Sequence, residues 1–145
     1  MEKKNTAEDN TGALLLLNSP KNVRLGIDHQ SWQIGVKFKG IKAIPPGPHY
    51  VHYSLEDEHH QHKLSFFLFI KPNSIMCRKW SEEKQQFIKM SEEEEEAYIE
   101  GVKNHDFNLN LGLYPIERYD LWKETTNCIT EKLINKLEII LLIIW

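Results

Sequence analysis

The sequence predicts an α+β domain: a β-sandwich or strongly bent antiparallel sheet over about residues 12–90, followed by two or three α-helices. Apolar and polar residues alternate repeatedly within the first 90 positions, as they do in half-buried strands. Proline and glycine concentrate at residues 45–48, which indicates a tight corner. A capping signal and helical spacing appear only after position 90. At 145 residues, the chain is long enough for one domain with a genuine core.

Charge and cysteine content narrow the class of protein. The net charge of −3 and the pI of about 6.2 give no overall attraction to nucleic acid, so direct nucleic-acid contact is not expected. Cys77 and Cys128 lie far apart in the sequence, and the polar residues 1–11 contain no apolar signal core. Both features favour a reduced, intracellular compartment. We expect residues 1–11 to be a disordered lead-in, and we expect no cofactor and no membrane association.

Strand signals open the domain. Residues 13–17 are a continuous apolar run closed by the Asn-Ser-Pro turn at 18–20, which is typical of a strand buried on both faces. Residues 34–39 alternate apolar and polar, so we expect a strand with one buried face. In the corner that follows, Pro46 suits the second position of a type II turn and Gly47 the third. Gly47 should therefore have a positive φ.

More strand signals follow the corner. Residues 50–55 alternate again, and residues 64–70 (LSFFLFI) give the strongest β signal in the chain. The latter run is closed by a turn at 71–73 and followed by a return strand at 75–80. We expect these two strands to form a hairpin at the sandwich core, with one short strand added at residues 87–88.

Helical signals begin at Ser91. This serine is a predicted N-cap, with Glu94 three residues later completing a capping box. Residues 104–115 are rich in Asn, Asp, Gly and Pro and are expected to be a loop, after which helical spacing resumes over 116–126. The apolar run at 139–145 is far shorter than the ~20 residues that a membrane-spanning helix needs.

Two clusters of polar residues suggest catalysis or metal binding, and we interpret both as structural. Asp28 and His29 precede a tryptophan, but no nucleophile lies beside them, so we expect Asp28 to bind backbone amides in an Asx-turn while His29 faces water. Residues 56–62 contain the ligand types of a zinc or nickel site. Their compact order favours a solvated hairpin loop. A metal-binding protein built on this His-rich loop is the less favoured alternative, and we assign no catalytic and no metal-binding residues.

A small RNA-binding module is the other alternative. Its support is a strip of lysines close to two aromatic residues, a combination that single-stranded RNA-binding proteins use. The strip consists of Lys37, Lys39 and Lys42 with Trp32 and Phe38. The lysines also fit the solvent side of a strand. Because phosphate contacts make affinity steeply salt-dependent, a weak salt dependence would count against this module.

The central segment also resembles a known family. The matching residues are Gly26-Ile27-Asp28, Ser31-Trp32-Gln33, Gly35, Lys37-Phe38-Lys39-Gly40, Ile44-Pro45-Pro46-Gly47 and His49 through His52-Tyr53, with Arg78-Lys79-Trp80-Ser81, Leu111 to Pro115, Trp122 and Thr126 to Thr130 further along. This pattern resembles the Aar-two (AAR2) family of splicing factors. The resemblance covers about residues 12–134, β-rich to about 90 and then helical. It leaves residues 135–145 as an atypical apolar tail, and the family's second, all-helical domain is missing, so we expect a truncated product or a misread gene end.

The resemblance implies a non-catalytic function. Members of the family are assembly chaperones of the spliceosomal U5 small nuclear ribonucleoprotein and hold its large scaffold protein, so the expected partner is that protein's ribonuclease-H-like domain, in nucleus and cytoplasm. Partner-binding residues are expected within the matching segment, namely Trp32, Lys37, Phe38, His49 and His52. Without the second domain, binding by this chain is expected to be weak.

Overall fold

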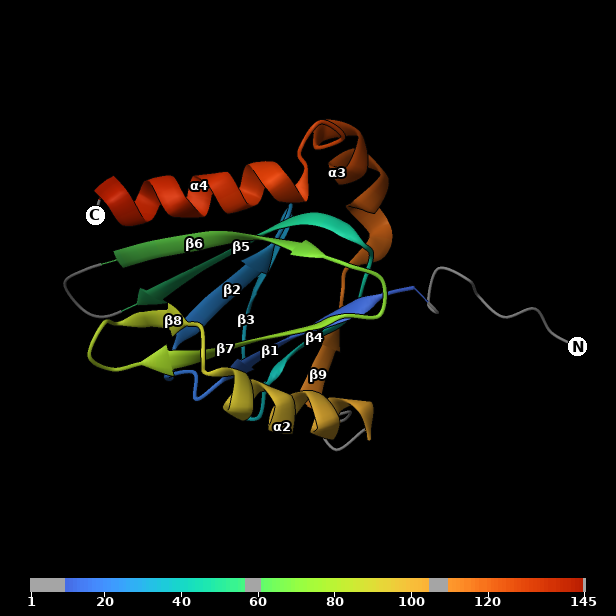
Figure 1. The fold of residues 1–145 in the computed structure, drawn as a ribbon. Coiled ribbons are helices and arrows are strands. Elements are labelled where there is room, and N and C mark those ends of the chain that lie inside the picture. Colours follow the sequence, from blue (N-terminus) through green and yellow to red (C-terminus); the bar gives the residue numbers. More distant parts are fainter. Residues whose placement is uncertain (1–9, 57–60, 105–109, 145) are drawn as a thin grey trace, which may run out of the picture.

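The computed structural model describes residues 10–56, 61–104 and 110–144, which form two β-sheets with helices outside them (Figure 1). One sheet has the strand order β8-β7-β1-β4-β9 and the other β3-β2-β5-β6. The strands of the first sheet are β1 (Gly12–Leu17), β4 (Gly40–Ile44), β7 (Ile75–Ser81), β8 (Gln86–Ile88) and β9 (Leu111–Leu113). Those of the second are β2 (Val23–Ile27), β3 (Gln30–Gln33), β5 (Gly47–Glu56) and β6 (Gln61–Ile70). The predicted α+β class is confirmed, in its sandwich form.

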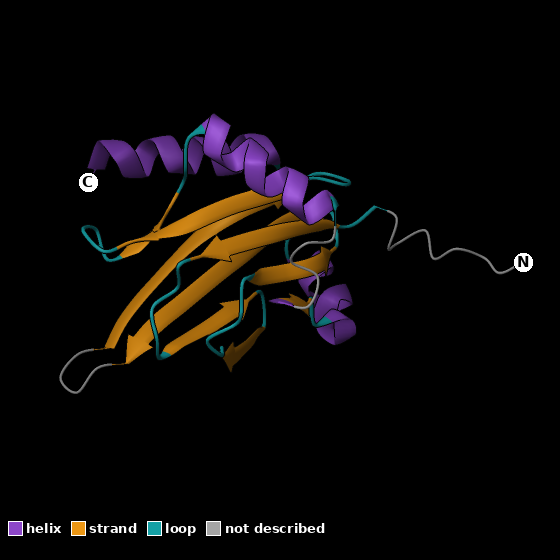
Figure 2. Ribbon diagram, turned by 90° about the horizontal axis from the view of Figure 1, so that it is seen from below, coloured by secondary structure: helices purple, strands orange, loops and turns teal. Residues whose placement is uncertain are grey.

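The described helices follow the β-rich part of the chain. They are α2 (Glu92–Lys103), the 3₁₀ helix η2 (Ile116–Arg118), α3 (Tyr119–Thr125) and α4 (Glu131–Ile144). In Figure 1 the two sheets lie between α4 and α2. Figure 2, seen from below, shows α2 lying in front of the strands. No helix in the described part of the chain is both long enough and apolar enough to cross a lipid bilayer.

Strand β1 is the centre of the fold, as its apolar run predicts. It pairs with β4 in antiparallel and with β7 in parallel orientation, and all six of its residues are buried. Leu14 and Leu16 face the core between the sheets, whereas Leu15 and Leu17 face a second apolar cluster beneath α2. A strand with covered faces on both sides has no polar alternation, which is why four consecutive leucines form a strand here.

Alternation predicts the inner face of the second sheet correctly. On β2, Val23, Leu25 and Ile27 are fully buried while Arg24 between them is exposed. On β5, Val51 and Tyr53 point into the core. The side chains between these residues therefore lie on the outer face of the sheet.

Residues 34–39 are a loop and not the predicted strand. Strand β3 ends at Gln33, and the chain then turns, with the Phe38 amide donating to the Gly35 carbonyl at 3.2 Å. Ile34 and Phe38 pack against the core, whereas Val36 is 85% exposed. The alternation arises because both ends of the loop dip into the core and its tip faces solvent.

The strands at 64–70 and 75–80 do not form the predicted hairpin. Strand β6 pairs along its length with β5, and β7 pairs with β1 in the other sheet. The turn between them therefore carries the chain from one sheet to the other, and the Ser74 hydroxyl braces it by donating to the Lys71 carbonyl at 2.8 Å. Hairpins and such sheet-to-sheet arches have the same apolar pattern, because in both the facing side chains enter one core.

The later elements are mostly as expected. Strand β8 confirms the short strand at 87–88, and Ser91 caps α2 by accepting from the Glu94 amide at 3.2 Å. The Glu94 carboxylate, however, lies 2.9 Å from the Lys79 ammonium group. The expectation of an uninterrupted loop at 104–115 is wrong, since β9 pairs in parallel with β4 within that segment.

Helix α4 lies along the edge of the second sheet. Glu131 and Glu138 pair with Lys71 and Lys89 at 3.2 and 3.0 Å, at the ends of β6 and β8, and Ile134 is buried between them. The segment interpreted as an atypical tail is thus the continuation of this helix as far as residue 144.

Candidate functional site

The turn between β2 and β3 places the Asp28 side chain in the interior, where groups from distant segments donate to it. His49 Nδ1 lies 2.6 Å from Asp28 Oδ2, the Tyr50 amide donates to Oδ1 at 2.8 Å, and the Tyr114 hydroxyl donates to Oδ2 at 2.5 Å. The Asp28 side chain is only 4% exposed. The expected local Asx-turn is therefore wrong, because the amide that Asp28 binds belongs to a residue on β5. Its histidine partner is His49, and His29 lies exposed against Trp122.

Both ring nitrogens of His49 are hydrogen-bonded within the protein. Nε2 lies 2.6 Å from the Pro45 carbonyl oxygen, which can only accept, so this nitrogen carries a proton. Nδ1 shares a hydrogen bond with the Asp28 carboxyl group at 2.6 Å. The ring is fully buried. Asp28 and His49 thus form a buried, hydrogen-bonded pair.

The corner at residues 45–48 anchors the helical segment that follows β9. Pro46 O accepts a hydrogen bond from the Tyr119 hydroxyl at 3.4 Å, and Pro48 O accepts one from Trp122 Nε1 at 2.7 Å. A proline carries a carbonyl but no amide hydrogen, so the three prolines of this corner offer acceptors only. The aromatic donors of η2–α3 are the complementary groups. Gly47 has φ +123°, as the turn prediction requires.

We refer to Asp28, His49, Tyr114, Tyr119 and Trp122 together as the junction, and aromatic rings surround His49 within it. The ring lies edge-on to Tyr114 at 5.4 Å and stacks with Tyr119 at 6.4 Å. Burial, together with the hydrogen bond to Asp28, raises the pKa of the Tyr114 phenol well above its ordinary value. Burial likewise raises the pKa of Tyr119. Both phenols are therefore held in the neutral, donating form that their hydrogen bonds require.

The junction is suited to fixing the fold and not to proton transfer. A general base must have a nitrogen free to take a proton from a substrate. In His49 both nitrogens are already hydrogen-bonded to fixed protein groups, and the ring has no exposed surface. The junction joins β2, β5 and the segment after β9 in one hydrogen-bonded unit.

A metal site has no support in the described part of the chain, where no group of three or more His, Cys, Asp or Glu side chains lies close enough to hold an ion. The side chains of the His-rich segment at 56–62 lie outside the described part of the structure. The β5–β6 pairing does show that this segment connects two antiparallel neighbours, since Glu56 pairs with Gln61. The hairpin is confirmed, and the metal-binding alternative stays a prediction.

The five residues expected to bind a partner do not form one surface. Trp32 and Phe38 are half-buried and pack against the core, so their ring faces are largely engaged within the protein. His49 belongs to the buried junction. Lys37 is exposed in the turn of the 34–39 loop. His52 is half-buried on the outer face of the second sheet, with Nε2 3.3 Å from the Asp28 carbonyl oxygen.

Sequence reasoning missed the role of three junction residues, Tyr114, Tyr119 and Trp122, although Tyr114 and Trp122 carry part of the family resemblance. They lie more than 60 positions after His49, and nothing in their local sequence pattern indicates a contact with the proline corner. The one available signal was their donor chemistry, because a corner made of prolines needs donors from elsewhere.

Comparison with known proteins shows to which family the chain belongs. A sequence model described as the AAR2 N-terminal domain matches residues 10–139 of the chain. The chain belongs to the AAR2 family. It is 32% identical to "Protein AAR2 homolog" of Homo sapiens and of Mus musculus over 129 residues, 86% of this chain and 34% of each relative. It is 33% identical to "Protein AAR2 homolog" of Caenorhabditis elegans over 137 residues, 91% of this chain and 36% of that relative. The chain thus spans about a third of the length of the curated relatives it matches.

The junction gives the AAR2 resemblance a physical basis. Many of the residues that carry the resemblance are those that build it: Asp28, the corner at 45–47, His49, Tyr114 and Trp122. These positions are scattered in the sequence and meet in the interior. Much of the family pattern in this chain therefore marks a structural element.

Proposed function

We propose that this chain acts in pre-mRNA splicing as a non-catalytic assembly factor. In this proposal it binds the ribonuclease-H-like domain of the large U5 scaffold protein during tri-snRNP biogenesis, in the nucleus and cytoplasm. The observation that carries the proposal is the match to the AAR2 N-terminal domain along residues 10–139. The junction is consistent with it, because its one buried histidine has no nitrogen free for catalysis.

The loop at 34–39 is the surface that we assign to the partner. Its tip presents Val36, which is 85% exposed, next to the exposed Lys37. The base of the loop is fixed, since the Lys39 amide donates to the Asn110 carbonyl at 2.8 Å and Phe38 packs against the core. An apolar side chain held outward on a fixed loop loses little conformational entropy on binding, which favours a protein contact.

Titration of the purified scaffold domain with this chain tests the proposal. We expect saturable binding, weakened about tenfold or more by Val36→Asp, since a buried charge without a partner is costly at an interface. Leu121→Asp is the matched control, because Leu121 is 52% exposed on α3, away from the loop. No binding by the unmodified chain would overturn the function. Equal affinity of the two variants would overturn only the assignment of the loop.

A second titration tests whether the part of the relatives that lies outside the match also contributes to binding. If the two thirds of a relative that lie outside the match also contact the scaffold, linking them to this chain should raise affinity by ~10²–10⁴ through effective concentration. Equal affinities with and without the added segment would show that this domain carries the whole interaction. Imaging of the tagged chain tests the proposed presence in both compartments.

A further inference from the structure

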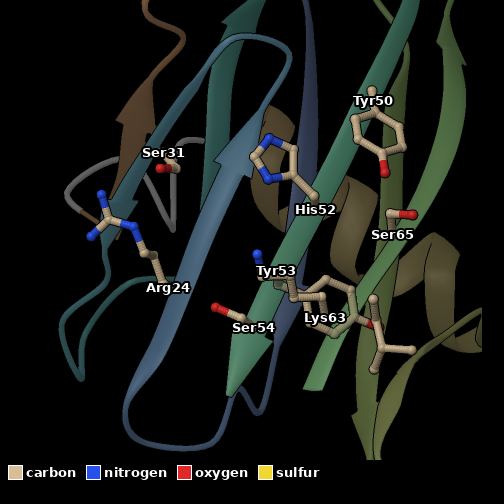
Figure 3. A pocket seen from close by; sticks show the side chains of 9 residues that line it. Arg24, Ser31, Tyr50, His52, Tyr53, Ser54, Lys63 and Ser65 are labelled. Atoms are coloured by element: carbon tan, nitrogen blue, oxygen red, sulfur yellow. The ribbon is translucent and has the colours of Figure 1, made fainter. Parts of the chain in front are cut away.

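The outer face of the second sheet carries a shallow pocket that the junction and the 34–39 loop do not use. Its volume is about 380 Å³, and the polar side chains lining it come from all four strands of the sheet (Figure 3). They are Arg24, Ser31, His52, Ser54, Lys63 and Ser65. None of the residues that line the pocket is acidic.

Strand register explains why these side chains meet. Arg24, Ser54 and Lys63 are direct cross-strand partners on β2, β5 and β6, so they form one row across the sheet. Ser31, Gly26, His52 and Ser65 form the next row on the same face. Neighbouring strands are ~4.8 Å apart, so Arg24 and Lys63 start about 10 Å from each other and bracket Ser54.

Gly26 makes room for the His52 ring, which lines the pocket. A Cβ atom at this position would lie 2.0 Å from His52 Cε1, so the imidazole ring occupies the space of the missing side chain. His52 is held there by its 3.3 Å contact with the Asp28 carbonyl oxygen and by stacking on Tyr50 at 5.4 Å. The ring is a fixed wall of the pocket.

The two cations and the three serine hydroxyl groups of the pocket have no competing partners among the described residues. Arg24 and Lys63 are exposed and make no ion pair there, and the hydroxyl groups of Ser31, Ser54 and Ser65 make no hydrogen bond there. In Figure 3 Lys63 extends from β6 over β5, and Arg24 leans toward Ser31. Two cations and three hydroxyl donors thus line one space, which has ample room for an anionic group on a peptide.

We propose that this pocket binds a phosphorylated side chain of a protein partner. A phosphoserine or phosphothreonine carries nearly two negative charges and three acceptor oxygens, which matches a guanidinium, an ammonium and several hydroxyl donors. Recognition of phosphorylated motifs by arginine-containing pockets is a general mode of peptide binding.

The same surface fits RNA poorly. Single-stranded RNA binding needs aromatic faces open to bases, but Tyr50 stacks on His52 and contacts Phe67 at 4.9 Å. A basic tract for successive phosphates is also absent from the pocket lining, which holds two permanent cations, and the chain carries a net charge of −3. The inference is independent of the proposed function, since it concerns the opposite face of β2 and β5 from the core and names no particular partner.

Chemical-shift mapping by NMR on the full chain tests the inference. The probes are a short alanine-flanked peptide with one phosphoserine, the same peptide with serine, inorganic phosphate and a short single-stranded RNA. We expect the phosphopeptide to shift the amide signals of Arg24, Ser54, Lys63 and Ser65 in a saturable way, and the serine peptide to shift none of them. Arg24→Ala should weaken affinity about tenfold, as loss of one charge-assisted hydrogen bond does, and Arg24→Ala/Lys63→Ala should abolish the shifts.

The control is Lys123→Ala, which removes an exposed cation on α3 outside the pocket and should leave affinity unchanged. Thermal melts should show that all variants remain folded, because the replaced side chains are exposed. Equal shifts with the serine peptide, no saturable shift with either phosphate probe, or loss of affinity in Lys123→Ala to the same degree as in Arg24→Ala would overturn the inference. RNA binding at these residues in the absence of phosphopeptide binding would overturn it in favour of a nucleic-acid surface.

Discussion

Asp28 is hydrogen-bonded to three residues that lie between 21 and 86 positions further along the chain. Its pairing with His49 is out of reach of water, since the side chains are 4% and 0% exposed. Removing the His49 ring leaves a cavity and deprives the buried Asp28 carboxyl group and Pro45 carbonyl of a hydrogen-bond partner. We therefore expect His49→Ala to lower the free energy of unfolding by about 3–5 kcal/mol, measured by urea denaturation.

Tyr114→Phe is the matched variant for that measurement. It removes one hydroxyl donor to Asp28 and keeps the ring, so the expected loss is about 1.5–3 kcal/mol, the range for a hydrogen bond to a charged group. A loss of less than about 1 kcal/mol in His49→Ala would contradict the buried hydrogen-bonded pair, because even an ordinary hydrogen bond contributes that much.

The raised pKa of Tyr114 also predicts a pH dependence. Burial and the bond to Asp28 keep the phenol protonated in the folded protein, whereas in the unfolded chain it ionises near its ordinary pKa of 10.0. Above that pH the unfolded state binds fewer protons than the folded state, so stability falls as pH rises. We expect the stability difference between the unmodified chain and Tyr114→Phe to be constant from about pH 7 to 9 and to shrink above about pH 10. A difference that grows at high pH would contradict this sign.

At the scale of elements, two glycines with positive φ differ in whether an added side chain would also collide with a neighbouring strand. Gly47 has φ +123° with open space where a Cβ would lie, whereas Gly40 has φ +149° and its Cβ would lie 2.1 Å from the Leu14 carbonyl oxygen on β1. We expect Gly47→Val to cost about 1–3 kcal/mol through strain alone. Gly40→Ala should cost more, because the β1–β4 pairing must open to admit the methyl group.

Gly35→Ala is the control for both glycine variants. It has open space and no positive φ, so its effect should stay within about 0.5 kcal/mol. Thermal melts of the three variants should rank Gly40→Ala as the least stable and Gly35→Ala as the most stable. If Gly47→Val melted with Gly35→Ala, the strained corner would be excluded.

The sequence predicts strands better than it predicts their partners. Alternation and apolar runs located β1, β5, β6 and β7 because each of these patterns reports which face of a strand is buried. The same patterns cannot distinguish a hairpin from an arch, and β7 pairs with β1, some 60 residues earlier. The 34–39 loop was predicted as a strand for a related reason, since two buried ends around an exposed tip give the same alternation as a half-buried strand.

The junction was predictable only in part. Asp28 and His49 were singled out through the family resemblance, but local reasoning placed Asp28 in an Asx-turn and gave it no histidine partner. The actual contacts depend on β2 and β5 being adjacent in the second sheet and on η2–α3 returning to the corner. Such contacts are long-range consequences of the fold, and no local pattern carries them.

At the scale of the whole molecule, β1 joins two apolar clusters. Its alternate leucines face the core between the sheets and the cluster beneath α2, which contains Cys77. This thiol is 1% exposed, and burial raises its pKa to about 12, whereas Cys128 is exposed. Alkylation requires an accessible thiolate, so Cys77 should react only when the structure around it opens.

Alkylation of the native protein followed by mass spectrometry should therefore modify Cys128 rapidly and Cys77 about 10³–10⁴-fold more slowly, if the domain is stable by about 5 kcal/mol. Cys128→Ser should remove the fast phase, and in urea both cysteines should react.

The informative variant is His49→Ala, whose site lies on the other side of β1 from Cys77. If the two clusters open as one cooperative unit, the loss of stability in this variant should accelerate Cys77 labelling by the corresponding factor, tenfold for each ~1.4 kcal/mol. A native protein in which Cys77 and Cys128 react equally fast would contradict the closed packing of α2 on the sheet. Unchanged Cys77 labelling in His49→Ala would mean that α2 and its cluster open independently of the sandwich core.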